Sequence, residues 1–144
     1  MNCRSDMKFS IVDSLNESDI EQLLALYGNE FWCDKRERDD VCLMLKNTDI
    51  VIGIKVAAGG LVGFVRVLTD YVFKATIYDL IVHPEWRGKA IGKLLMDSVI
   101  NHRELSRVEH FDLHCLPKMY PFYEKWGFTA ELGGVGIMRK HHRK

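Results

Sequence analysis

The chain has 144 residues, enough for one domain with a sizeable core and too few for two domains of ordinary size. Lysines and arginines number 20, aspartates and glutamates also number 20, and the formal net charge is zero. No global field therefore draws the chain to nucleic acid or to an anionic membrane, and we expect a small molecule or a protein as its partner.

The four cysteines, Cys3, Cys33, Cys42 and Cys115, are scattered along the chain. They form no Cys-x-x-Cys pair and have no histidine spacing typical of zinc, so we expect reduced thiols and no metal site. The N-terminus is polar, and no apolar stretch is long enough to span a bilayer. These features favour a cytoplasmic protein.

The first third of the chain predicts one strand and two helices. Lys8 to Val12 alternates apolar and polar residues, which indicates a strand at a sheet edge. Ser18-Asp19-Ile20-Glu21 has the spacing of a capping box and begins a helix that ends at Gly28. A second, more charged helix is expected over residues 36–46.

Three strands are expected next. Ile50 to Ala57 and Leu61 to Leu68 are apolar, β-branched runs separated by Ala58-Gly59-Gly60, which predicts a hairpin. The third strand is Ala75 to Val82, and Pro84 follows its end.

This third strand leads into Arg87-Gly88-Lys89-Ala90-Ile91-Gly92 and directly into a helical pattern that begins at Ile91. A glycine-containing turn at a helix start presents unpaired backbone N–H groups and the positive end of the helix dipole, which together bind phosphate. The spacing of Gly88 and Gly92 matches neither the nucleotide P-loop nor the dinucleotide fingerprint. A diphosphate is nevertheless the expected ligand.

The last part of the chain predicts a strand over His110 to Cys115 and a short helix over Met119 to Trp126, stopped by Gly127. Phe128 to Glu131 and Val135 to Arg139 predict a terminal hairpin. The resulting order, β-α-α-β-β-β-α-β-α-β-β, indicates an α/β (α+β) fold, with a mixed, mostly antiparallel sheet and helices on both faces.

Two segments resemble motifs of the GCN5-related N-acetyltransferase (GNAT) family. Arg87, Ala90 and Gly92 occupy the three defined places of its motif Arg/Gln-x-x-Gly/Ala-x-Gly/Ala. Phe122 to Phe128 resembles its segment Phe-Tyr-x-x-x-Gly-Phe. The element order is also that of the family, so the resemblance covers nearly the whole chain.

The resemblance implies one GNAT-type domain over residues 1–144, with flexible ends at 1–6 and 141–144. It implies acetyl-CoA as co-substrate, bound where the strands before and after the motif helix splay apart. It also implies that Tyr123 protonates the leaving thiolate, although Tyr123 packing its helix onto the sheet is the alternative. The residues expected to bind acetyl-CoA are Ile81, Val82, Arg87, Gly88, Lys89, Ala90, Ile91, Gly92, Lys93 and Tyr123.

The resemblance does not single out the base that accepts the amine proton: Tyr78, Asp79 and His83 lie on or beside the strand before the motif, and His114 and Cys115 end the next strand. Asp79 is preferred because burial among apolar neighbours would raise its pKa. The other reading, a structural partner for an arginine or a backbone amide, stays open. Strand alternation would place Tyr78, Leu80 and Val82 on one face and Asp79, Ile81 and His83 on the other.

Phe31 and Trp32, between the first two helices, are expected to form an aromatic wall of the acceptor site. The resemblance therefore implies direct acetyl transfer to a primary amine, either of an arylalkylamine or polyamine or of a protein. The alternative is a catalytically silent acyl-CoA sensor of the same fold. Dimers are frequent in the family, so a homodimer is also an expectation.

Overall fold

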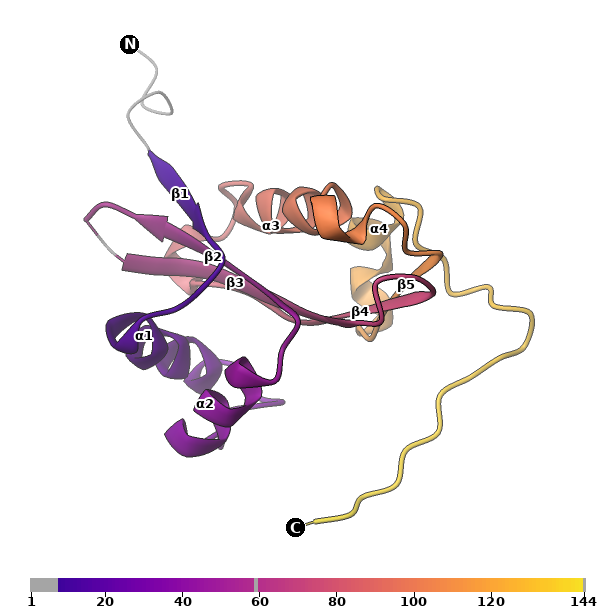
Figure 1. The fold of residues 1–144 in the computed structure, drawn as a ribbon, viewed down its shortest axis with the longest axis horizontal. Coiled ribbons are helices and arrows are strands. Elements are labelled where there is room, and N and C mark those ends of the chain that lie inside the picture. Colours follow the sequence, from indigo (N-terminus) through magenta and orange to yellow (C-terminus); the bar gives the residue numbers. More distant parts are fainter. Residues whose placement is uncertain (1–7, 59, 144) are drawn as a thin grey trace. The chain divides into compact units, whose positions relative to one another are not determined.

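The computed structural model describes residues 8–58 and 60–143 (Figure 1). The chain forms two compact units, which divide between residues 113 and 114. Of the ends expected to be flexible, residues 1–6 and 144 lie outside the described residues, and residues 141–143 carry no regular secondary structure.

The first unit contains most of the regular structure. Its elements are β1 (Phe9–Val12), α1 (Glu17–Gly28), α2 (Arg38–Lys46), β2 (Ile50–Val56), β3 (Gly60–Thr69), β4 (Lys74–Val82), α3 (Ile91–Ile100) and β5 (His110–Leu113). Each predicted element of this region is confirmed, with ends that move by a few residues. The N-terminal cap of α1 differs from the prediction, because it is Asn16 and not Ser18. The backbone N–H of Asp19 donates to the Asn16 side chain, and the backbone N–H of Asn16 donates to the Asp19 side chain.

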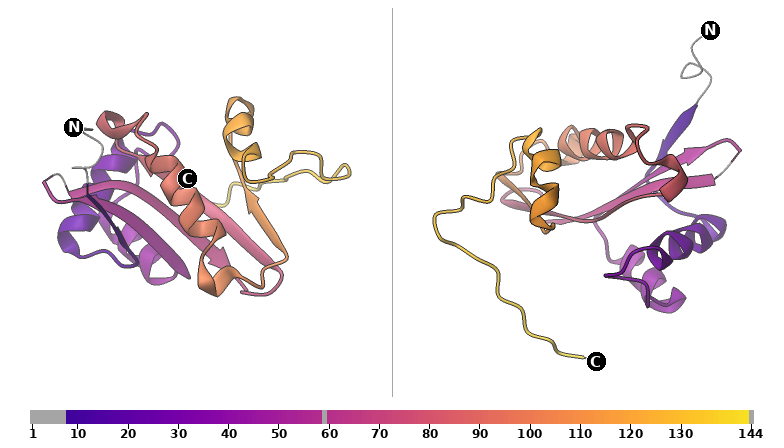
Figure 2. Two further views of the ribbon diagram at one scale, coloured as in Figure 1. Left: turned by 90° about the horizontal axis from the view of Figure 1, so that it is seen from above. Right: turned by 180° about the vertical axis from the view of Figure 1, so that it is seen from behind.

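The sheet has the strand order β1-β2-β3-β4-β5. The first four strands form an antiparallel meander, and β4 pairs with β5 in parallel through the crossover helix α3. Helices α1 and α2 cover one face of the sheet and α3 covers the other (Figures 1 and 2). This is the predicted mixed sheet with helices on both faces.

The ladder between β4 and β5 is short. It ends at the pair Ile77 and Leu113, whereas β4 continues to Val82. Among the residues that the structure describes, the second half of β4 therefore has a strand partner only on the β3 side. The β5 side of this half is a sheet edge without a strand ladder, which agrees with the expected splay of the two strands.

Two apolar layers hold the helices on the sheet. On one face, Leu23, Leu26 and Tyr27 of α1 pack with Phe64 and Ile81. On the other face, α3 buries residues at helical spacing, namely Ile91, Leu95, Met96 and Val99. Both layers meet at β3 and β4, so these strands fix where the two helical faces lie.

The second unit contains only one α-helix, α4 (Tyr120–Glu124), among its described residues. The helix is followed by Gly127 with a φ of 87°, which agrees with the predicted stop. The predicted terminal hairpin is wrong: residues 128–143 form no strand. An isolated two-stranded hairpin is marginally stable, and Met138 is 98% exposed with no apolar layer to cover.

No described helix is long and apolar enough to cross a membrane. Within residues 8–58 and 60–143, no group of three or more His, Cys, Asp or Glu side chains could hold a metal ion.

Gly63 on β3 sets how closely α3 approaches the sheet. A Cβ at this position would lie 2.7 Å from Cγ2 of Ile91, the first residue of α3, and 3.2 Å from Cδ1 of Leu95. Both side chains are fully buried and cannot turn away into solvent. The absence of a side chain at Gly63 therefore positions the start of α3.

We predict that Gly63→Ala lowers the free energy of unfolding by about 1–3 kcal/mol, because the added methyl overpacks a dense core. Urea unfolding measures this difference. Gly28→Ala is the matched control, since nothing lies within 4 Å of a Cβ there. A Gly63→Ala variant as stable as Gly28→Ala would contradict the assigned role of Gly63.

Candidate active site

Strand β4 contains a β-bulge at Asp79. Tyr78 pairs with Arg66 and Ile81 pairs with Phe64, so three steps along β4 match two steps along β3. Asp79 has a φ of 58°, in the left-handed region that aspartate adopts more easily than most residues. The bulge lies just beyond the end of the β4–β5 ladder, where the edge of β4 becomes free.

The bulge overturns the expected alternation of side chains along β4. Phe64 and Arg66 are two residues apart on β3 and share a face. Their partners Ile81 and Tyr78 therefore also share a face, whereas strict alternation would separate them. The guanidinium carbon of Arg66 lies 4.9 Å from the centre of the Tyr78 ring, which agrees with this arrangement.

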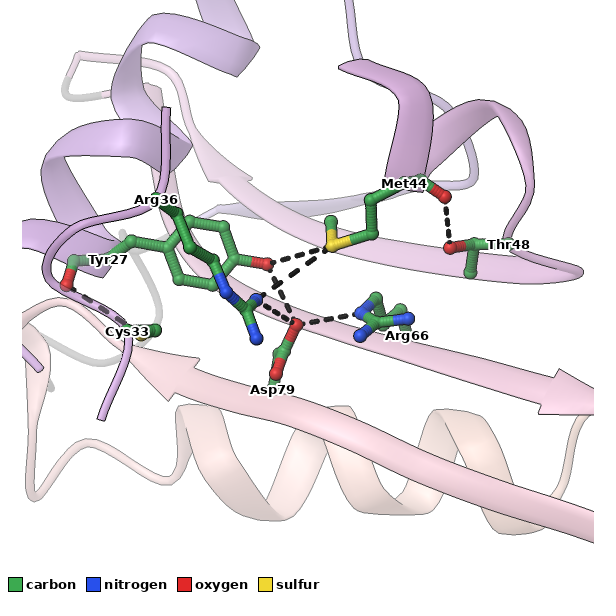
Figure 3. A network of polar contacts seen from close by, with 7 residues as sticks. All are labelled: Tyr27, Cys33, Arg36, Met44, Thr48, Arg66 and Asp79. Carbon is green, nitrogen blue, oxygen red and sulfur yellow. Dashed lines mark hydrogen bonds and ion pairs between the residues drawn. The ribbon is translucent and has the colours of Figure 1, made fainter. Parts of the chain in front are cut away.

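The Asp79 carboxylate is the centre of a buried polar network (Figure 3). Its Oδ2 accepts hydrogen bonds from Nε of Arg66 at 2.7 Å, from Nη1 of Arg36 at 2.8 Å and from the hydroxyl of Tyr27 at 2.9 Å. The Asp79 side chain is only 4% exposed. A buried carboxylate with two guanidinium partners is a charge-assisted network in which the conformation of each member depends on the others.

The expected raised pKa of Asp79 is wrong. Burial alone would raise it, but the hydrogen bonds and charges of Arg66 and Arg36 outweigh burial and hold the pKa of this carboxyl below its ordinary value. Asp79 is therefore ionised at neutral pH and already bound by three donors. This geometry supports the alternative that Asp79 is a structural partner for arginine. Asp79 was preferred as the base because of a raised pKa, and that reason no longer holds.

The same network fixes the segment between α1 and α2. The guanidinium of Arg36 lies over the Tyr27 ring at 4.7 Å and over the Trp32 ring at 5.7 Å. Trp32 is 44% exposed and Phe31 is 77% exposed. The two predicted wall residues thus lie on a segment that Arg36 ties to β4, with aromatic surface open to solvent.

The turn before α3 is shaped by two residues with positive φ, Gly88 at 78° and Ala90 at 64°. Ala90 is the N-cap of α3 and supplies no side-chain hydrogen bond, and the first turn holds no acidic residue. A Cβ at Gly88 would have no atom within 4 Å, so the turn is open above it. An uncapped helix start beside an open glycine turn has the donors and the space that a phosphate group needs.

The cationic side chains near this turn have partners. Arg87 donates from Nη2 to Oε1 of Glu30 at 2.9 Å and from Nε to the carbonyl of Val82 at 3.3 Å. Nζ of Lys89 lies 6.0 Å from the centre of the Trp86 ring, and Lys93 pairs with Asp97 one turn along α3. Arg87 therefore connects the turn, the end of β4 and the segment that carries Phe31.

Tyr123 lies in the second unit, on α4, and is buried there. Its ring packs edge-on against Phe122 at 4.9 Å and against Phe128 at 6.1 Å between ring centres. Burial, with a smaller contribution from Cys115, raises the pKa of Tyr123 to about 12. The hydroxyl is consequently protonated at neutral pH and can act as a proton donor.

The sequence reasoning missed the partners of the predicted site residues: Tyr27, Arg36 and Arg66 around Asp79, and Glu30 beside Arg87. The one available signal was an aspartate in an apolar strand, since a buried carboxylate needs a cation or several donors. Nothing in the sequence says which of the 20 lysines and arginines supplies the cation.

The comparison with known proteins decides the family. The family profile of the acetyltransferase (GNAT) domain matches residues 46–130, which contain β4, the turn and α3. The chain belongs to the GNAT family. It is an N-acetyltransferase, an enzyme that transfers an acetyl group, as the resemblance of the two motifs implied.

Two sequence relatives and one solved structure illustrate the match of this GNAT acetyltransferase. The uncharacterized N-acetyltransferase ycf52 of Pyropia yezoensis is 33% identical over 133 residues, which are 90% of this chain and 74% of the relative. The histone acetyltransferase TAP1 of Glycine max is 28% identical over 135 residues, 87% of this chain and 58% of the relative. A crystal structure assigned to the GNAT family, from Xanthomonas campestris, superimposes with a TM-score of 0.79 at 25% identity and 94% coverage of both chains.

We predict that Asp79→Asn lowers the free energy of unfolding at pH 7 by about 3 kcal/mol, because two guanidinium groups then lose their counter-charge. The folded pKa of Asp79 lies below the unfolded value of about 4, so its stabilisation is present above that pH and is lost as the pH falls below it. Urea unfolding between pH 7 and pH 3 should show a larger acid loss in the wild type than in Asp79→Asn, which keeps only the loss from other carboxylates such as Asp70.

The control is Asp34→Asn, which removes an exposed carboxylate from the segment between α1 and α2. It should keep both the stability and the acid dependence of the wild type. Equal stabilities of Asp79→Asn and Asp34→Asn would show that the Asp79 network does not stabilise the fold.

Proposed function

We propose that the protein transfers the acetyl group of acetyl-CoA directly to a primary amine that carries an apolar or aromatic body. The observation that carries this proposal is the open, uncapped turn at Gly88 to Ala90, which follows the half of β4 that has no strand partner on the β5 side among the described residues. A diphosphate and an extended amide chain are the two parts of coenzyme A that such a turn and such a strand edge bind.

The residues of the turn fit the diphosphate. The first backbone N–H groups of α3 have no side-chain acceptor, and the positive φ values of Gly88 and Ala90 keep the turn open. Arg87 and Lys89 add positive charge beside the turn. Gly92 and Lys93 lie in the first turn of α3, where the helix dipole favours an anion.

Strand β4 supports the amide part. When bound, acetyl-CoA supplies an activated acetyl group as a thioester. The N–H and C=O groups of Val82 point away from β3 and would hold the pantetheine amides as an added strand, whereas those of the neighbouring Ile81 face Phe64 of β3. Asp79 acts as a positioning residue in this proposal, because its ionised carboxylate holds the bulge that reorients the backbone of β4 just before these residues.

Tyr123 would act as the general acid. A phenol whose pKa is raised to about 12 keeps its proton at neutral pH, so its Oη can donate that proton to the departing sulfur. The acceptor amine must lose its own proton. Tyr78 stays a candidate for contact with this amine, because it pairs with Arg66 and lies on the same face of the sheet.

The acceptor class is supported by Phe31 and Trp32, whose rings are exposed on the segment linked to both β4 and the turn. Such rings favour an amine with an aromatic or apolar body. The name of the Glycine max relative is that of a histone acetyltransferase, so a lysine side chain of a protein is the second acceptor class to test.

The diphosphate site predicts the effect of a charge at Gly88. Gly88→Glu should weaken acetyl-CoA binding in calorimetry by at least about tenfold, because a carboxylate would face the anion at the helix start. Gly133→Glu is the matched control, since Gly133 also has a positive φ and nothing within 4 Å of its Cβ. An unchanged affinity of folded Gly88→Glu for acetyl-CoA would contradict the assignment of this turn as the diphosphate site.

The catalytic role of Tyr123 predicts that Tyr123→Phe lowers kcat by roughly a hundredfold while the Kd for acetyl-CoA stays the same. Release of the free thiol, measured with arylalkylamines, polyamines and a lysine peptide, gives the turnover and the acceptor class. Tyr120→Phe, on the same helix with an exposed ring, is the control and should retain kcat. Binding of acetyl-CoA without thiol release for any amine would instead favour a sensor.

A further inference from the structure

Arg87 and Glu30 form an ion pair that joins the turn before α3 to the segment that carries Phe31 and Trp32. The pair is 2.9 Å long, and the second contact of Arg87, at 3.3 Å, is to the carbonyl of Val82. Glu30 is 21% exposed and Arg87 is 54% exposed, so the carboxylate is the more enclosed member. Arg87 thus donates to the carbonyl of Val82, which lies on the edge of β4 where the proposed function places pantetheine.

Both contacts of Arg87 conflict with bound acetyl-CoA. A carbonyl that accepts from Arg87 Nε offers less room to a pantetheine amide, and a guanidinium committed to a carboxylate is unavailable to a diphosphate. A diphosphate carries more negative charge than one carboxylate and accepts bidentate hydrogen bonds from arginine. It should therefore compete successfully with Glu30 for Arg87.

We propose that Glu30 is the specificity residue for the amine, that Arg87 holds it in the free enzyme, and that acetyl-CoA releases it to bind the ammonium form of the acceptor. This proposal rests on the proposed function. The released carboxylate directly precedes Phe31 and Trp32 in the chain, so it would stand beside the aromatic wall. A negative group next to exposed rings matches an ammonium joined to an apolar body.

The exchange predicts a defined dependence between the two substrates. Before acetyl-CoA binds, the charge of Glu30 is balanced by Arg87, and the amine meets no free carboxylate. After it binds, the charge of Arg87 is balanced by phosphate and the charge of Glu30 by the amine. Each substrate should therefore raise the affinity of the other by the same factor.

The test compares Glu30→Gln with Asp34→Asn, since both remove one carboxylate from the same segment and Asp34 is exposed. Calorimetry with acetyl-CoA alone should give a Kd about two- to fivefold lower for Glu30→Gln. This factor corresponds to the free energy of a surface ion pair, because Glu30 no longer competes with the diphosphate for Arg87. Steady-state kinetics with the best amine should give a KM at least about tenfold higher, with a smaller change in kcat. Glu30→Asp should recover part of the KM, and Asp34→Asn should match the wild type in every measurement.

Unchanged or weaker acetyl-CoA binding in Glu30→Gln would overturn the competition for Arg87. An equal rise of the amine KM in Asp34→Asn would overturn the specific role of Glu30, because general negative potential would then explain it. These outcomes differ from failure of the proposed function, in which the wild type binds no acetyl-CoA and both proposals fall together.

Discussion

The carboxylate of Asp79, bound to Arg36, Arg66 and Tyr27, is the interaction on which the rest of the site depends. A residue with positive φ inside a strand is costly unless its surroundings fix it. Here three charge-assisted or phenolic hydrogen bonds fix it, and they come from α1, from the segment after α1 and from β3. The network therefore joins three elements at the place where β4 leaves its ladder with β5.

The network lies on β4 just before the strand edge and the turn that are proposed to bind acetyl-CoA. Beyond Asp79, the backbone of β4 leads through Ile81 and Val82 to the turn at Gly88 and the start of α3. Gly63 lets α3 approach β3 closely enough for Ile91 to be buried at the helix start. Strand edge and helix start are thus fixed by packing from opposite faces of the sheet, one through Asp79 and the other through Gly63.

The features that depend on neighbouring residues along the chain could be predicted from the sequence. The strands, the helices of the first unit and the turn from Arg87 to Gly92 follow from local periodicity and glycine placement. Prediction failed where distant residues decide: Asp79 depends on partners 43 and 52 positions away, and these lower the pKa that burial alone would raise. The terminal hairpin failed for a related reason, because alternation from Val135 to Arg139 creates no strand without an apolar layer to pack on.

Membership of the GNAT family establishes acetyl transfer. We propose that the network around Asp79 orients the backbone of β4 for binding acetyl-CoA. A crystal structure of the protein with coenzyme A tests this most directly. We expect Asp79 to keep a positive φ and both arginine contacts, with pantetheine along Ile81 and Val82 and the diphosphate at Gly88 to Gly92. Coenzyme A bound elsewhere, or Asp79 in an extended conformation without its arginines, would contradict it.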